Sequence, residues 1–385
     1  MSSWKSLRWL VRVSAAGSVA LLALASCGKF FPPLTSGGGG GGGGGSTAGD
    51  YLFAGNLGTS PPTIAGFTIA NSALSVTSGA PWQVSLEPTS LAVTPDDSYL
   101  YMGSAAGGIY VYTIGSGGAL TIGNNGTPVA TGVAPGILRV DPSGKWLLGA
   151  DALAGEAYVF QIGSGGALTS ISSSVVTLNA TVAATDLEIT PSGNYVFVAD
   201  GTAGIYTLSF NSTTGALAQV NSVLSPKQSG DADYGMAIAP SGGFLFAAET
   251  GIGAVRVFSI SSSGVLAETA GSPVSTGTGP FAVLVDSTGS YVYVANRTPG
   301  TISAFLLSNS GALTAIAGSP FSTGSLPVAM VEDKSHTYVA VLCAGGNPDL
   351  QVFSFNTTTA GALQSFATAK TGTDPTEASS LAATH

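Results

Sequence analysis

The sequence predicts an all-β fold, a seven-bladed β-propeller with four antiparallel strands in each blade, because two short features recur at a fixed period. The first feature is an aromatic residue that opens a predicted strand. Its copies, the ruler aromatics, are Tyr51, Tyr99, Trp146, Tyr195, Phe244, Tyr291 and Tyr338, which lie 47 to 49 residues apart. The second is the leucine of a Gly-Ala-Leu turn or its equivalent, at Leu74, Leu120, Leu168, Leu217, Leu266, Leu313 and Leu363. A period of about 40–50 residues rich in short strands is typical of a propeller with one four-stranded blade per repeat.

The repeat over residues 280–313 indicates how each blade is built. Predicted strands cover Ala282–Val285, Tyr291–Ala295 and Ile302–Leu307, with a turn at Asp286–Gly289 between the first two. The second strand, Tyr-Val-Tyr-Val-Ala, is apolar throughout and does not alternate with polar residues. Strands of this kind are buried on both faces, as face-to-face stacking of blades requires.

The two ends of the repeat region predict that the ring closes through the C-terminus. A proline lies eleven residues before the ruler aromatic at Pro88, Pro135, Pro280 and Pro327. The next such proline is Pro375, close to the C-terminus, whereas Tyr51 begins at the second strand of a blade. We therefore expect Thr376–Thr384 to supply the innermost strand of the first blade, which also removes an open sheet edge.

Residues 1–27 have the pattern of a secretory leader. Basic residues precede an apolar stretch of 13 residues, Val13–Ala25, which is too short to span a bilayer comfortably. The leader ends in Leu-Ala-Ser-Cys, which resembles the lipobox of bacterial lipoproteins, where cleavage leaves a lipidated cysteine, here Cys27, as the N-terminus. An ordinary leader with an incidental cysteine is the alternative. Since Gly28 follows the cysteine, we expect an extracytoplasmic protein anchored by lipid to the cell envelope, at the outer membrane.

Residues 28–49 are expected to form a flexible linker, and residues 50–385 the propeller. The linker contains nine consecutive glycines, which lose the most conformational entropy on ordering. Once Cys27 carries lipid, Cys343 has no partner for a disulfide. We interpret Cys343 as a small buried hydrophobe, with a reactive thiol as the alternative.

The composition argues against nucleic acid as a partner. Charged residues make up 8% of the 385 residues, against about 25% in an average protein, and the formal net charge is −9. Three of the 11 basic residues lie in the leader, so the rest of the chain carries 8 basic and 20 acidic side chains, a net charge of −12. Nucleic-acid phosphates require a basic surface. We expect a monomer whose partners are the membrane, through the lipid, and an unidentified protein or carbohydrate-like ligand.

Acidic residues gather in the loops that surround the usual ligand-binding face of a propeller. They are Glu87, Asp151, Glu156, Asp186, Asp200, Asp231, Asp233, Glu249, Asp349, Asp374 and Glu377. One interpretation is a solvated acidic rim. The other is a Ca²⁺ site or a site for a cationic ligand, because hard cations bind several carboxylate oxygens. The candidates for ligand binding are Asp200, Asp231, Asp233, Glu249 and Glu377. No cofactor other than Ca²⁺ is considered, since the sequence shows no further metal or phosphate motif.

Two charged residues occupy equivalent positions on adjacent inner strands. Seven residues before the ruler aromatic, most repeats carry an apolar residue, but the third carries Arg139 and the fourth Glu188. Asp186 lies two residues before Glu188, on the same face of its strand. This placement is compatible with a structural ion pair and with a functional pair near the axis. Arg297, in a loop after a second strand, is another cation expected on the ligand-binding face.

The repeat resembles the lactonase-like seven-bladed propellers, which include 6-phosphogluconolactonase and the YVTN-repeat proteins. The residues that carry the resemblance are Tyr291–Asn296, Gly311–Leu313, Gly318–Gly324 and the closing segment Asp374–His385. The resemblance covers residues 50–385 and implies that His and Arg near the starts of inner strands carry the activity. The sequence departs from that pattern, because the matching positions hold Gly136, Ile137, Ala184, Thr185, Tyr234, Gly235 and Val328.

Two functions are compatible with the sequence. The first is a membrane-tethered binding or interaction module, which the lipid anchor, the linker and the departures from the family pattern favour. The alternative, implied by the resemblance, is a lactone hydrolase with a non-standard site, in which an Asp or Glu acts as the base and an arginine stabilises the oxyanion. The catalytic candidates are Arg139, Asp186, Glu188 and Arg297.

Overall fold

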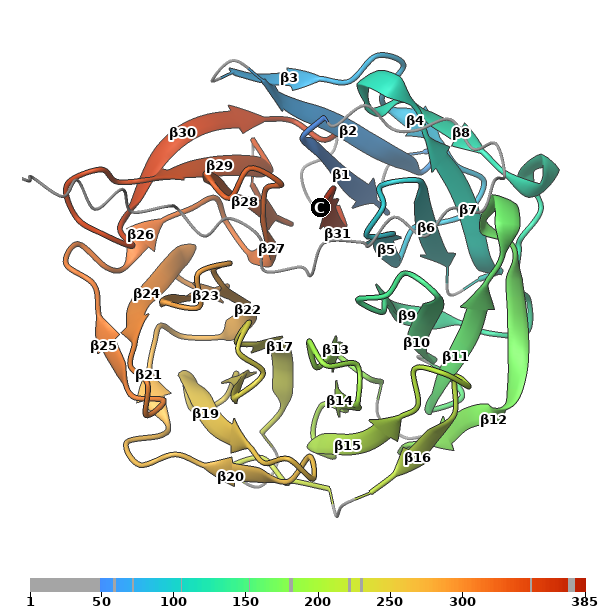
Figure 1. The fold of residues 1–385 in the computed structure, drawn as a ribbon. Coiled ribbons are helices and arrows are strands. Elements are labelled where there is room, and N and C mark those ends of the chain that lie inside the picture. Colours follow the sequence, from blue (N-terminus) through green and yellow to red (C-terminus); the bar gives the residue numbers. More distant parts are fainter. Residues whose placement is uncertain are drawn as a thin grey trace, which may run out of the picture. The chain divides into compact units, whose positions relative to one another are not determined.

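Seven β-sheets form a ring in the computed structural model of the chain (Figure 1). The structure describes residues 49–57, 60–70, 73–104, 106–151, 153–179, 183–220, 223–228, 231–346, 348–372 and 378–385. In each sheet one strand lies nearest the axis, and the others follow outward (Figure 1). Among these residues, no helix is long and apolar enough to cross a membrane. The ring of seven antiparallel sheets confirms the predicted all-β propeller.

The first four blades, each named from the innermost strand outward, have the following bounds. Blade 1 contains β31 (Ala378–Ala383), β1 (Tyr51–Asn56), β2 (Thr63–Ala70) and β3 (Ala73–Val76), with a short β4 (Trp82–Gln83). Blade 2 contains β5 (Ser90–Val93), β6 (Tyr99–Ser104), β7 (Gly108–Ile114) and β8 (Leu120–Ile122). Blade 3 contains β9 (Pro135–Val140), β10 (Trp146–Asp151), β11 (Glu156–Ile162) and β12 (Leu168–Thr177). Blade 4 contains β13 (Asp186–Ile189), β14 (Tyr195–Ala199), β15 (Ile205–Phe210) and β16 (Leu217–Gln219).

The remaining three blades follow the same plan. Blade 5 contains β17 (Asp233–Ile238), β18 (Phe244–Glu249), β19 (Ala254–Ile260) and β20 (Leu266–Glu268), with a short β21 (Val274–Ser275). Blade 6 contains β22 (Pro280–Val285), β23 (Tyr291–Asn296), β24 (Thr301–Leu307) and β25 (Leu313–Ala315), with a short β26 (Phe321–Ser322). Blade 7 contains β27 (Pro327–Glu332), β28 (Tyr338–Cys343), β29 (Leu350–Phe355) and β30 (Leu363–Ala369). Short 3-10 turns occur at η1 (Ser116–Gly118), η2 (Asn124–Gly126) and η3 (Ser164–Gly166).

The expected four antiparallel strands per blade are confirmed, with one addition. In blades 1, 5 and 6 a two-residue strand also pairs with the third strand, beside the outer one. The segment Gly318–Gly324, one of those that carry the resemblance to the lactonase-like propellers, contains β26. These sheets are therefore broader at their outer edge than the repeat alone predicts.

The ruler aromatics mark contacts between consecutive blades. In six cases the aromatic ring lies against the glycine two residues before the ruler leucine of the next blade. The pairs are Tyr51 with Gly118, Tyr99 with Gly166, Trp146 with Gly215, Tyr195 with Gly264, Phe244 with Gly311, and Tyr291 with Gly361. These glycines have φ between 74° and 83°, a conformation that L side chains avoid. A Cβ atom would overlap the ring at five of these glycines, and at Gly166 it would overlap Val111 and crowd the ring of Tyr99, so the two sequence features share one physical cause.

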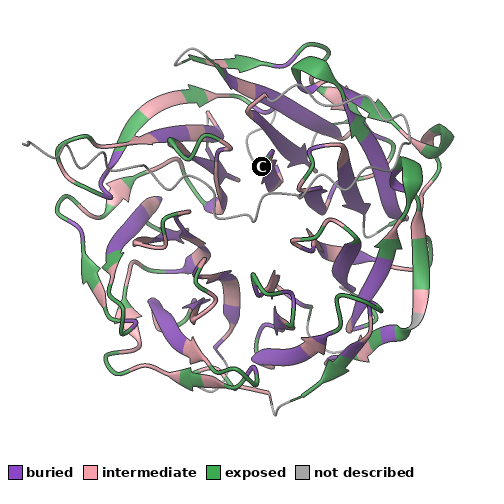
Figure 2. Cartoon of the chain, in the orientation of Figure 1, coloured by how far each residue is buried: buried purple, intermediate pink, exposed green. Residues whose placement is uncertain are grey.

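Apolar side chains fill every interface between blades. The described residues form seven buried apolar clusters, and each cluster draws on two consecutive blades. The cluster between blades 7 and 1, for example, combines Leu342 and Val352 with Leu52 and Phe67. Figure 2 shows that the second and third strands are mostly buried, whereas the outermost strands are largely exposed. The core is therefore a ring of seven layers around the axis.

The C-terminal strand closes the ring as predicted. β31 pairs antiparallel with β1, and Leu52, Ala54 and Gly55 face Ala383, Leu381 and Ser380. Around the end of this pairing, the backbone N–H of Tyr51 donates to Oγ1 of Thr384 at 2.9 Å. The inner strand of the first blade thus comes from the far end of the chain.

Cys343 is buried, as expected from the sequence. It ends β28, has 0% exposure and has no disulfide partner in the described part of the chain. Burial raises the pKa of its thiol to about 11. The thiolate is the reactive form of cysteine, so the structure supports a packing role and not a reactive thiol.

We expect removal of residues 378–385 to abolish cooperative unfolding, because β1 would expose a sheet edge and the cluster between blades 7 and 1 would open. A milder change, Leu381→Ala, should lower the free energy of unfolding by about 2–4 kcal/mol. The same substitution at the exposed Leu306 serves as its control and should cost about 0.5 kcal/mol or less. Urea denaturation followed by circular dichroism measures both, and a truncated protein as stable as the intact chain would contradict this closure.

Candidate functional site

Arg139 lies between two carboxylates of the neighbouring blade. It is the fifth residue of β9, and Asp186 and Glu188 belong to β13. Its Nη2 atom lies 2.8 Å from Oδ1 of Asp186 and 3.4 Å from Oε1 of Glu188, which confirms the proximity predicted from the repeat. The side chains of Arg139, Asp186 and Glu188 are 38%, 11% and 23% exposed. Because all three come from innermost strands, we call this group the axial site.

Asp186 connects three consecutive blades. In addition to Arg139 of blade 3, it accepts hydrogen bonds from the backbone N–H groups of Met236 in blade 5, at 2.7 Å, and of Leu187, at 2.8 Å. Burial raises the pKa of Asp186, whereas Arg139 and these two N–H groups lower it. Three donors fix the orientation of the carboxylate. Asp186 thereby holds the guanidinium of Arg139 in place.

Glu188 is the titratable group of the axial site. Burial raises the pKa of its carboxyl to about 7, while the nearby Arg139 lowers it and Asp186 raises it further. Its only described contact with a donor is the long one to Arg139, at 3.4 Å from Nε and from Nη2. A carboxyl that is partly exposed and titrates near neutral pH can take up and release a proton under ordinary conditions.

The predicted acidic rim is wrong for four aspartates, which point into the protein. Asp151, Asp200, Asp231 and Asp349 are at most 8% exposed. Each accepts hydrogen bonds from backbone N–H groups of nearby loops. Asp151 accepts from Ala134, Leu153 and Ala154, and Asp231 accepts from Ala232, Gly251 and Ile252. Asp200 accepts from Asn179, and Asp349 accepts from Thr371. Carboxylates that satisfy buried N–H groups set the shape of loops and are not available to a ligand.

A buried charged cluster in blade 5 was missed by the sequence analysis. Arg256, in the middle of β19, is 3% exposed. Its guanidinium lies 3.6 Å from Glu249, 4.0 Å from Asp233 and 3.5 Å from Glu268. Its Cζ atom also lies 4.6 Å from the centroid of the Phe258 ring. The available signal was an arginine inside the apolar run Ala-Val-Arg-Val-Phe.

The carboxylates of this cluster are enclosed. Asp233 and Glu249 are 0% exposed, so they cannot contact a ligand in this conformation, contrary to their selection as candidates. Burial raises the pKa of Asp233 to about 7, against the lowering effect of Arg256, and burial also raises the pKa of Glu249. The described residues contain no group of three or more His, Cys, Asp or Glu side chains arranged to hold a metal. The expected Ca²⁺ site therefore stays a prediction, and Glu377 and Cys27 lie outside the described residues.

Arg297 lies one residue after β23 and packs on an aromatic ring. Its Cζ atom is 4.5 Å from the centroid of Phe281, and the Phe281 and Tyr234 rings are 4.8 Å apart at an interplanar angle of 35°. Phe281 and Tyr234 are the second residues of the adjacent inner strands β22 and β17. Arg297 is thus not part of the axial site. The aromatic residues beside it, Phe281 and Tyr234, were not among the candidates chosen from the sequence.

The two histidines lie away from the axial site. His336, in the turn after β27, is 3.5 Å from Glu332 and its side chain is 55% exposed. His385, at the C-terminus, is 3.7 Å from Asp97. Both histidine side chains are partly exposed.

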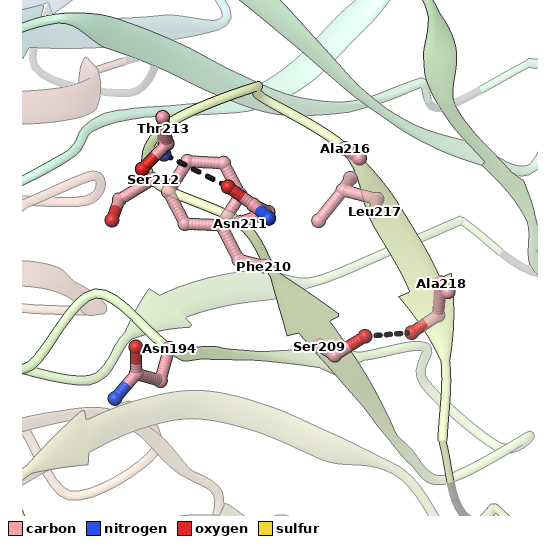
Figure 3. Close-up of a pocket in the computed structure, with 9 residues that line it drawn as sticks. All are labelled: Asn194, Ser209, Phe210, Asn211, Ser212, Thr213, Ala216, Leu217 and Ala218. Carbon is pink, nitrogen blue, oxygen red and sulfur yellow. Dashed lines mark hydrogen bonds between the residues drawn. The ribbon is translucent and has the colours of Figure 1, made fainter.

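A shallow pocket of about 440 Å³ lies on blade 4, between the ends of β14, β15 and β16 (Figure 3). It is lined by Asn194, Ser209, Phe210, Asn211, Ser212, Thr213, Ala216, Leu217 and Ala218. Within it, Oγ of Ser209 donates to the carbonyl of Ala218 at 3.2 Å. The lining contains no ionisable side chain, so this pocket has no acid, base or charge for catalysis.

Residues 52–379 match the sequence profile of a family described as "Lactonase, 7-bladed beta-propeller". The chain belongs to this lactonase family. A search of curated proteins gave no match for this lactonase-family chain.

Solved structures with the same fold include three proteins named for lactonase activity. A protein from Bacteroides uniformis provisionally named 6-phosphogluconolactonase aligns with a TM-score of 0.71 and 18% identity over 88% of this chain and 100% of its own. One from Bacteroides fragilis with the same provisional name gives 0.70 and 20% over 88% and 98%. The periplasmic gluconolactonase of Pseudomonas aeruginosa gives 0.70 and 18% over 88% and 99%. At these identities the likeness to the lactonase-family structures shows the fold alone.

The two arginine clusters should differ in their contribution to stability. Arg256→Met leaves Asp233 and Glu249 buried without a cation, and should lower the free energy of unfolding by about 3–5 kcal/mol. Arg139→Met removes a partly exposed, screened contact, and should cost about 1–2 kcal/mol. Urea denaturation at pH 7 compares the two variants. Equal losses would show that the exposure of Arg139 does not weaken its ion pairs.

Proposed function

We propose that the protein hydrolyses a lactone at the axial site. The observation that carries this proposal is the placement of Glu188, with its pKa raised to about 7, beside the partly exposed guanidinium of Arg139. A base and an oxyanion stabiliser are the two groups that lactone hydrolysis needs. Membership of the lactonase family and the names of the three similar structures support this reaction over a binding module.

In the proposed reaction, Glu188 acts first as a general base. Its carboxylate takes a proton from a water molecule, and the water oxygen attacks the carbonyl carbon of the lactone. Negative charge develops on the carbonyl oxygen, and this oxygen accepts hydrogen bonds from Arg139, which Asp186 holds in position. The ring C–O bond then breaks, and protonated Glu188 returns the proton to the leaving oxygen. The product is the open-chain hydroxy acid.

A panel of five- and six-membered sugar lactones tests the proposal on the purified full-length protein. Glu188→Gln should lower kcat/KM by about 10²–10⁴-fold, because the base is lost. Wild-type activity should rise with pH through about 7, as Glu188 loses its proton, and this step should be absent from the residual activity of the variant.

Asp96, exposed in the turn between β5 and β6, provides a matched control, because Asp96→Asn makes the same change from carboxyl to amide outside the loops of the ligand-binding face. Its activity and pH profile should equal those of the wild type. Absence of turnover for every lactone by a folded wild-type protein would contradict the proposal and would leave the binding or interaction module as the better account. Calcium added to parallel assays tests the prediction of a Ca²⁺ site.

We also propose that the protein acts outside the cytoplasm, attached to the cell envelope by a lipid on Cys27. The support is the leader pattern of residues 1–27 and the glycine-rich segment 28–49. The similar Pseudomonas aeruginosa gluconolactonase is named as periplasmic, which agrees with an extracytoplasmic location.

Replacement of Cys27 tests the anchor. Cys27→Ser should move the protein from the membrane fraction to the soluble fraction or leave the leader uncleaved, because the site of lipid attachment is gone. Cell fractionation and mass spectrometry of the N-terminus measure the change, with Cys343→Ser as the control for loss of a thiol. Membrane attachment of a cleaved Cys27→Ser protein at the wild-type level would rule out the lipid on Cys27.

A further inference from the structure

We infer that Arg297, Phe281 and Tyr234 form a subsite for a carboxylate. The three residues come from the loop after β23 and from the starts of β22 and β17. Tyr234 lies two residues before Met236, whose N–H group binds Asp186 of the axial site. The inference rests on the proposed function in one respect, since it makes the substrate a lactone that also carries a free carboxylate.

The charge of Arg297 has no ion-pair partner among the described residues, unlike the charges of most other cations there. In the described residues, carboxylates lie within 4.0 Å of Arg139, Lys227, Arg256 and Lys334. Lys145 and Lys370 are exposed to solvent. Arg297 is half-buried, yet it has neither an ion-pair partner nor a hydrogen-bond acceptor in this part of the chain. Its Nε atom is buried and lacks an acceptor, a state that is costly for a charged donor.

The guanidinium of Arg297 is held in a defined position. Stacking on Phe281 fixes the side chain, and the backbone N–H of Arg297 donates to the carbonyl of Gly279 at 2.8 Å. The stacked guanidinium has one face covered and its Nε buried, so the Nη1 and Nη2 groups along its outer edge are the donors left for a ligand. That edge matches the two oxygens of a carboxylate, with two parallel hydrogen bonds.

The two aromatic residues depart from the repeat at this position. Ten residues before the ruler aromatic, the other described blades have the small or β-branched residues Thr89, Gly136, Thr185 and Val328. Those blades also form four-stranded sheets with buried apolar clusters between them, so the fold does not require an aromatic residue there. Phe281 and Tyr234 instead supply apolar faces beside the charge, and such faces suit the C–H surface of a sugar ring.

The charge of the site favours a carboxylate over a phosphate. One guanidinium balances a single negative charge, and the described residues place no second unpaired cation beside it. A phosphate monoester carries nearly two negative charges at neutral pH. The chain as a whole is also acidic, at −9, which disfavours a dianion.

Three sugars that differ only at C6 test the inference by binding, without turnover: glucose, glucuronate and glucose 6-phosphate. In calorimetric titrations of the full-length protein, glucuronate should bind about tenfold or more tightly than the other two sugars. This difference in affinity is what one charge-assisted hydrogen-bonded pair contributes. Arg297→Gln should abolish this preference. Arg297→Lys should keep part of it, because lysine retains the charge but lacks the two-pronged geometry. Lys145→Gln, which removes an exposed charge elsewhere, should leave it unchanged.

Equal binding of glucose and glucuronate, no binding of glucuronate, or an unchanged preference in Arg297→Gln would each overturn the subsite. Tighter binding of glucose 6-phosphate would overturn its assignment to a carboxylate. The Glu188→Gln variant separates this inference from the proposed reaction, because it should bind glucuronate normally while losing turnover. Turnover with no dependence on Arg297 would refute the subsite alone, and binding with no turnover of any lactone would refute the proposed reaction alone.

Discussion

The arrangement of the seven blades depends on one repeated contact, in which an aromatic side chain of one blade packs against a glycine of the next blade. In six of the blade interfaces, the glycine has a positive φ and no room for a Cβ atom, so neither partner can change independently. This contact fixes how far one sheet is rotated from the next, and the apolar clusters then fill the space between the sheets. The seventh interface, between blades 7 and 1, is filled by the apolar cluster that joins Leu342 with Leu52. Inside blade 1, the pairing of β31 with β1 makes the stability of that blade dependent on the last residues of the chain.

A fold made of such repeats leaves few positions for chemistry, and the charged residues that remain are consequently informative. Carboxylates close to the ends of strands bind backbone N–H groups of the loops, as Asp151 and Asp231 do, and so complete the fold. Arg256 is enclosed together with its acidic partners. In the described part of the chain, the group around Arg139 and the stacked Arg297 combine charge, a fixed position and partial exposure, which is why the proposed reaction and the proposed subsite are assigned to them.

The axial site also shows how packing changes the chemistry of an ordinary carboxyl group. Nothing in the sequence around Glu188 indicates an unusual pKa. Burial among the inner strands nevertheless raises the pKa of Glu188 to about 7, against the lowering effect of Arg139. Asp186, two residues away, instead receives three hydrogen bonds and serves as the anchor of the arginine. Two acidic residues on one short strand thus have different environments, and the difference arises from the blades on either side.

The sequence by itself determined the number of blades, the approximate strand bounds, the closing strand and the pairing of Arg139 with Asp186 and Glu188. These features follow from period and register, which a repeating chain displays directly. Only the tertiary structure decided which acidic loop residues point inward, that Arg256 is surrounded by carboxylates, and that Tyr234, Phe281 and Arg297 lie together. Such contacts join residues of different strands or blades, and the direction of a loop side chain depends on unpaired N–H groups that no local pattern reveals.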